Sequence, residues 1–102
     1  MSSAIFEARD LFREAFSLRR YGKLDNAFYH AVRFISPKVE KDFTVRRARS
    51  IYEGTAKRID SEEMDALREA LIEEMRREHQ ETRDRLAALD KKIAALDQEA
   101  GR

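Results

Sequence analysis

The longest regular pattern of hydrophobic and polar positions in the chain is an apolar seam that runs through residues 60–100. Its members are separated by 3-4-4-4-3-4-3-4-3-4 residues, an eleven-residue stretch followed by strict heptads. This spacing predicts one long helix that forms a coiled coil with a single stutter near its start. The seam consists of Met64, Leu67, Leu71, Met75, His79, Thr82, Leu86, Leu89, Ile93, Leu96 and Ala100.

The start of this helix carries a strong sequence signal. Asp60 is a favourable N-cap, and Glu63 follows three residues later, which together make a capping box. Ile59 and Met64 flank the cap at the spacing of a hydrophobic staple. A helix from here to the end of the seam should be about 55 Å long, because each residue adds about 1.5 Å.

So long a helix cannot bury its whole seam against the remaining residues of the chain, so we expect a partner, most simply a second copy. The sequence therefore predicts a helical head, residues 1–58, on a dimerisation stalk, residues 59–102. Charges beside the seam favour a parallel homodimer, since opposite charges then face each other at the g and e positions. The attractive pairs between two copies are Glu78–Arg83, Arg85–Asp90 and Lys92–Asp97.

Three shorter apolar stripes with helical spacing precede the stalk, so we predict an all-α fold with a three-helix head. The first helix should run from Ser3 to Arg20, before Gly22, and the second from Leu24 to Ile35. Ser36-Pro37 should end the second helix, and residues 36–43 should form a connector. Ser36 and Pro37 are also a suitable N-cap and first residue for one short helical turn. The third helix should have Thr44 as its N-cap, run from Val45 to Glu53 and stop at Gly54.

Charge is divided unevenly between the two parts. The whole chain has a net charge of +1, but residues 1–58 carry 13 Lys/Arg against 7 Asp/Glu, whereas residues 59–102 carry 8 against 13. A basic head on an acidic stalk suggests that the head has a polyanionic partner, although two halves of a charged surface also differ by chance.

The third helix concentrates this positive charge. Arg46 and Ser50 point away from its apolar edge, so with Arg49 they should face base edges in a DNA major groove. Arg47, Lys57 and Arg58 should contact phosphates. A surface for another protein and an ordinary solvated basic face both remain open as alternatives.

The order of helix, helix, turn and basic helix over residues 3–58 resembles small helix-turn-helix proteins of bacterial and phage origin. The residues Arg49-Ser50-Ile51-Tyr52-Glu53-Gly54 through Arg58-Ile59-Asp60 also look like a stretch in small proteins of alphaproteobacterial prophages. The resemblance implies a dimeric DNA-binding regulator of transcription. The connector over residues 36–43 departs from the pattern, since the usual turn has three or four residues and often a glycine.

The sequence offers few residues for a catalytic, cofactor or metal site. The chain has no Cys and no glycine-rich phosphate loop, and no nucleophile has a base beside it, so we expect no enzyme, cofactor, metal site or small-molecule substrate. His30 lacks partners for a catalytic or metal role, and His79 should form a polar layer in the stalk that fixes its register. No segment is apolar enough for a membrane, and we expect a cytoplasmic protein. The alternative function is a protein-interaction adaptor or inhibitor that uses the head or the stalk.

Overall fold

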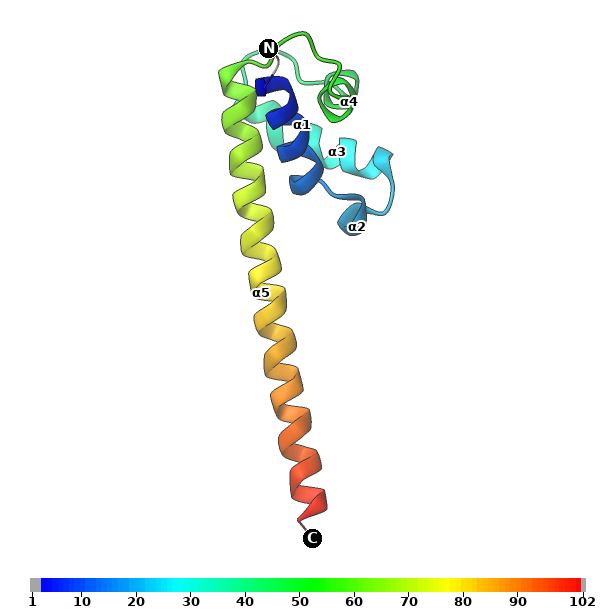
Figure 1. Ribbon diagram of the computed structural model, residues 1–102, viewed down its shortest axis with the longest axis vertical. Helices are drawn as coiled ribbons and strands as arrows, with labels where there is room; N and C mark the ends of the chain where they lie inside the picture. Colours follow the sequence, from blue (N-terminus) through cyan, green and yellow to red (C-terminus); the bar gives the residue numbers. More distant parts are fainter. Residues whose placement is uncertain (1–2, 102) are drawn as a thin grey trace.

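The computed structural model describes residues 3–101, and this part of the chain is all-α, as predicted (Figure 1). Three of the predicted helices have the expected bounds, including their caps at Thr44, Gly54 and Asp60. The elements are α1 (Ser3–Ala15), α2 (Leu18–Tyr21), α3 (Leu24–Ile35), the 3₁₀ turn η1 (Ser36–Lys38), α4 (Val45–Glu53) and α5 (Ser61–Ala100).

The first predicted helix is wrong in one respect, because the structure breaks it into two. α1 ends at Ala15, and Ser17 adopts an extended backbone (φ −74°, ψ 149°) as the N-cap of α2. The Ser17 hydroxyl accepts a hydrogen bond from the Arg20 amide at 3.3 Å, so a local cap replaces continued helix. The break leaves Phe16 buried and directs the side chain of Arg20 toward α5.

One core joins the head to the start of the stalk. Its largest fully buried side chains come from α1, α3, α4 and α5: Phe12, Phe28, Ile35, Ile51 and Leu67. Alanines lie between them at fully or nearly fully buried positions, where a small side chain lets helices approach closely: Ala8, Ala27, Ala31, Ala48 and Ala66. The packing unit of the head therefore includes the first turns of α5.

This packing corrects the expectation that the whole seam faces a partner. Met64 and Leu67 are 8% and 0% exposed within one chain, and Leu71 is half-buried against the same core. Every residue from Met75 to Gly101 is exposed. The result is an elongated molecule of 67 × 25 × 22 Å in which the free part of α5 projects away from the head (Figure 1).

Two buried carboxylates fasten the stalk to the head. Glu63 and Glu74 are 6% and 5% exposed, and each is paired with an arginine of the head. The Arg20 Nε lies 2.7 Å from Glu74, and its Nη2 lies 2.8 Å from Glu81, two turns further along α5. These contacts fix the direction in which the stalk leaves the head.

The hydrogen bonds that Arg20 donates to Glu81 and Glu74 raise the pKa of its guanidinium above the ordinary value. The same interaction lowers the pKa of the Glu81 carboxyl, with the Arg20 hydrogen bond as the main cause. Both groups are therefore held in their charged forms at the junction of the head and the stalk.

Candidate nucleic-acid interface

The basic helix α4 presents one face to the core and the opposite face to solvent. Ala48 and Ile51 are fully buried, and the Thr44 hydroxyl caps the helix by accepting from the Arg47 amide at 3.1 Å. Gly54 ends the helix in the left-handed conformation (φ 75°), which glycine adopts without strain. The outward direction, opposite Ala48 and Ile51, is occupied by Arg46, Arg49 and Glu53.

Arg46 and Arg49 are the two predicted base contacts that the structure leaves exposed. No carboxylate of residues 3–101 lies within ion-pair distance of either guanidinium. The guanidinium carbon of Arg49 lies 5.0 Å from the centre of the Phe28 ring, which holds the side chain against the head. Arg46 has no comparable restraint within the described chain, so its guanidinium is free to meet a ligand.

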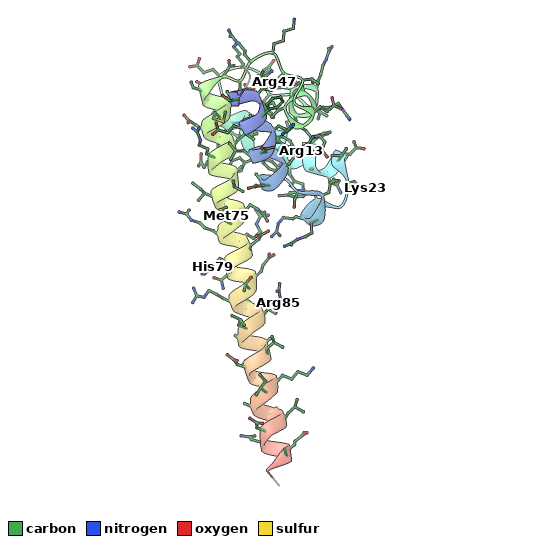
Figure 2. All side chains as sticks on the ribbon, in the orientation of Figure 1. Arg13, Lys23, Arg47, Met75, His79 and Arg85 are labelled. Carbon is green, nitrogen blue, oxygen red and sulfur yellow. The ribbon has the colours of Figure 1, made fainter. Side chains whose placement is uncertain are left out.

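Arg47 is not a free cation. Its Nη2 and Nε lie 2.6 and 2.8 Å from the two carboxylate oxygens of Glu63, and Nη2 also donates to the carbonyl of Arg58 at 2.8 Å. The hydrogen bonds to Glu63 raise the pKa of Arg47, while its partial burial acts in the opposite direction. The contacts of Arg47, which Figure 2 labels at the head end of the molecule, thus join α4 to α5, and its guanidinium is not free for a phosphate.

The remaining predicted residues surround one hollow beside α4. Ser50, Lys57 and Arg58 line it, with Lys41 added from the connector, and its volume is about 460 Å³. Lys57 is exposed and has no ion pair among the described residues, whereas Arg58 lies 3.7 Å from Asp60. The Ser50 hydroxyl donates to the Arg47 carbonyl at 2.8 Å, so it already has a hydrogen bond within the helix.

Arg13 is a basic residue of this surface that the sequence did not reveal. Its Nε donates to the Tyr52 carbonyl at 3.0 Å, and its guanidinium lies 4.6 Å from the centre of the Tyr52 ring. The ring centres of Tyr52 and Phe28 are 5.7 Å apart. Arg13 and Arg49 therefore cover two aromatic rings that are in contact with each other. Arg13 is remote from α4 in sequence, and no local pattern connects the two.

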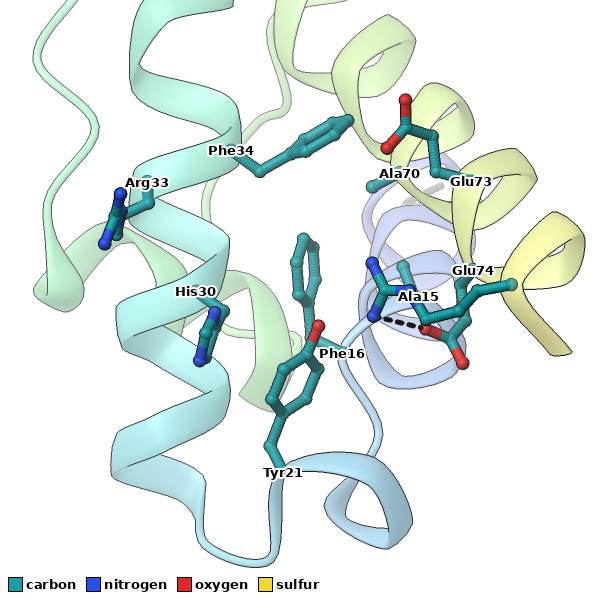
Figure 3. Close-up of a pocket in the computed structure, with 10 residues that line it drawn as sticks. Ala15, Phe16, Tyr21, His30, Arg33, Phe34, Ala70, Glu73 and Glu74 are labelled. Atoms are coloured by element: carbon teal, nitrogen blue, oxygen red, sulfur yellow. Dashed lines mark hydrogen bonds and ion pairs between the residues drawn. The ribbon is translucent and has the colours of Figure 1, made fainter. Parts of the chain in front are cut away.

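A second hollow, of about 410 Å³, lies between α3 and α5 (Figure 3), and no residue of α4 lines it. Phe16, Tyr21 and Phe34 give it an aromatic wall, and the His30 ring stacks on Tyr21 at 4.6 Å. The Glu74 carboxylate at its edge is already paired with Arg20 and with Arg77 at 3.4 Å. His30 therefore serves packing here and is not placed with the residues predicted to bind DNA.

The stalk carries a second candidate surface. All six exposed large apolar residues of α5 are about half-exposed, between 48% and 56%: Ile72, Met75, Leu86, Leu89, Ile93 and Leu96. Ile72 was not part of the seam expected from the sequence. Contiguous exposed apolar surface of this kind marks an interaction site. The exposed seam therefore points to an oligomeric partner.

Within the described part of the chain, no group of three or more His, Cys, Asp or Glu residues is arranged to hold a metal ion. None of the described helices combines the length and the apolar character that crossing a membrane requires.

The sequence matches no protein-family model, and searches of curated proteins and of solved structures found no match. The resemblance to small helix-turn-helix proteins therefore stays a prediction.

Proposed function

We propose that the protein is a DNA-binding regulator that acts as a homodimer. The observation that carries this proposal is the outer face of α4, where Arg46 and Arg49 are exposed and have no carboxylate partner among residues 3–101. α4 lies near the start of α5, and the free end of the stalk lies at the opposite end of the molecule (Figure 1). A duplex can approach this face without meeting the stalk.

In this arrangement α4 enters the major groove with its N-terminal half foremost, which is the half that recognition helices use for base edges. Arg46 lies in that half and Arg49 at the middle of the helix, and arginine makes bidentate hydrogen bonds to guanine. We infer phosphate contacts for Lys57, which is exposed on the flank of α4 and has no ion pair among residues 3–101. Glu53 lies at the other end of the outer face, where its charge keeps that end away from the DNA backbone.

Two heads are needed because one short helix contacts few bases. A dimer bound to two half-sites doubles the number of contacts and matches a two-fold symmetric site. The exposed seam of α5 supplies the surface for this self-association, and its parallel pairing places both heads at the same end of the stalk.

A second candidate function is a protein-interaction adaptor. It is favoured by the exposed apolar residues of α5, since such a seam also pairs with a helix of different sequence. In that case the exposed arginines of α4 are solvated and bind nothing.

The deciding experiment measures the affinity of the full chain for a generic duplex by fluorescence anisotropy between about 50 mM and about 200 mM salt. Contacts to several phosphates predict a steep loss, with a log–log slope of about −0.9 per contact. The variant R46A/R49A should bind much more weakly, and K23A/K91A, which removes the same charge elsewhere, should bind like the parent chain. No binding at the lower salt concentration overturns the DNA proposal and favours the adaptor.

A further inference from the structure

The exposed apolar residues of the stalk follow one heptad register without interruption. Counting back from Leu96, the exposed seam is Ile72, Met75, His79, Thr82, Leu86, Leu89, Ile93 and Leu96, with steps that alternate strictly between three and four residues. The stutter expected from the sequence arises because Leu71 was placed in the seam. In the structure Leu71 packs against the head core, and its neighbour Ile72 is 49% exposed.

From this register we infer that the stalk pairs with a second copy of the chain as a parallel, in-register, two-stranded coiled coil that begins at Ile72. The inference rests on the self-association in the proposed function and deepens it. It excludes Met64, Leu67 and Leu71 from the interface, because these side chains already belong to the head. Each helix thus changes at Ile72 from packing on its own head to packing on its copy.

The residue types at the core positions favour two strands. Two of the four a positions, Ile72 and Ile93, are isoleucine, and two of the four d positions, Leu89 and Leu96, are leucine. β-branched residues at a with leucine at d favour parallel dimers over larger assemblies. His79 and Thr82 form a polar layer between the two apolar parts, and such a layer penalises slipped registers.

Charge complementarity selects the orientation. In the parallel arrangement Arg85 and Lys92 face Asp90 and Asp97 of the second copy. Glu78, which lies 3.5 Å from Arg19 of its own head, also faces Arg83 of the second copy. In an antiparallel pair with the same overlap, Arg85 faces Arg85 of the other copy and Arg83 faces its own counterpart. Only the parallel arrangement makes every charged g–e pair attractive.

The head does not obstruct this pairing. The side of α5 that packs on the head is marked by Glu63, Leu67, Ala70 and Glu74, all of them buried. The exposed seam lies about one third of a turn away around the helix, since successive residues are separated by about 100°. The contacts of Arg20 with Glu74 and Glu81 hold the head on its own side. The two heads therefore lie on opposite flanks of the paired stalk.

The chain has no native cysteine, so single-cysteine variants of the full chain report the register directly. A disulfide needs Cα atoms within about 7 Å of each other, a distance met by identical a positions of a parallel pair. Under mild oxidation I72C and L86C should form covalent dimers in high yield. D84C, whose side chain points away from the seam, and L71C should stay monomeric on non-reducing gels, with folding checked by circular dichroism.

Several outcomes overturn the inference. Failure of I72C to cross-link while L86C does so means that the interface begins further along the stalk. Cross-linking of L71C in preference to I72C restores the stuttered register, and cross-linking only in a mixture of I72C with L96C shows antiparallel pairing. No cross-linking of any variant means that the copies do not pair. These results are independent of DNA affinity, so the dimer and the DNA proposal fail separately.

Discussion

The two parts of α5 have similar apolar periodicity but a different environment. Between Glu63 and Glu74 the inward side chains pack on the helices of the head, and two buried carboxylates there are neutralised by arginines. From Met75 to Ala100 every side chain is exposed, including four leucines and isoleucines in the distal seam. One helix thus stabilises the fold with its first turns and offers its remaining turns for association.

The two parts of α5 also differ in how their contacts depend on protein concentration. Contacts inside the head are intramolecular, so their contribution to the free energy of unfolding is the same at any dilution. Contacts along the distal seam are intermolecular, and they stabilise the protein by mass action. All nine aromatic residues belong to the head, so tyrosine fluorescence reports its unfolding separately from the stalk.

The largest effect is expected for Leu67→Ala, at the centre of the head core. Leu67 is 0% exposed, and removal of a buried leucine side chain costs about 2–5 kcal/mol. Urea unfolding followed by tyrosine fluorescence should show this loss at every protein concentration. Leu89→Ala is the matched control on the exposed seam and should leave the unfolding of the head unchanged. Equal losses from both substitutions would mean that the head and the stalk do not differ as described.

Leu89→Asp combined with Ile93→Asp should have the next largest effect, on association alone. Two charges in the seam face their own copies and are desolvated when the helices pair, so the dimer should dissociate. Light scattering should give the mass of one chain at tens of micromolar, and tyrosine fluorescence should show an intact head. A parent chain that is already monomeric at that concentration contradicts the proposed self-association.

Local signals in the sequence predicted most of the helix bounds. Thr44, Gly54 and the pair Asp60–Glu63 cap their helices as expected, because a cap depends on neighbours within a few residues. The break at Ser17 was missed, because the helix with an apolar stripe up to Phe16 was expected to continue to the stop signal at Gly22. Whether such a stripe bends is decided by what lies on its far side, here the buried Phe16 and the α5 partners of Arg20.

Contacts between distant segments limited the prediction of the candidate sites. Arg47 was expected to meet phosphates, but its partner Glu63 lies on another helix. The choice between Leu71 and Ile72 is ambiguous in sequence, because both fit an apolar stripe, and the packing of the head resolves it. Arg46 and Arg49 were correctly expected to be exposed, since their orientation follows from the helix itself.

A smaller effect, confined to DNA binding by the head, is expected for Arg46→Ala. A bidentate arginine–guanine contact contributes about 1–3 kcal/mol of discrimination, so this variant should lose affinity for a preferred site more than for random duplex. Lys57→Ala should weaken both about equally and reduce the salt slope by about one. Competition binding with a selected site measures the difference. Equal losses from Arg46→Ala on both duplexes would assign this residue to the DNA backbone.

The smallest effect is expected for Glu81, which lies where the head meets the stalk. Its carboxylate should make the stability of the fold depend on pH in the acid range. The Arg20 hydrogen bond lowers the pKa of Glu81 below its ordinary value of 4.5, so the folded chain binds this proton less readily than the unfolded chain does. The resulting stability is present above that value and is lost as the pH falls through the lower, folded pKa. Glu81→Gln should therefore reduce the drop in the urea midpoint between about pH 6 and about pH 3.

Glu73→Gln is the control on the same helix, because that carboxylate has no arginine partner among residues 3–101. If both variants keep the full acid sensitivity of the parent chain, the Arg20–Glu81 contact does not fasten the stalk in solution.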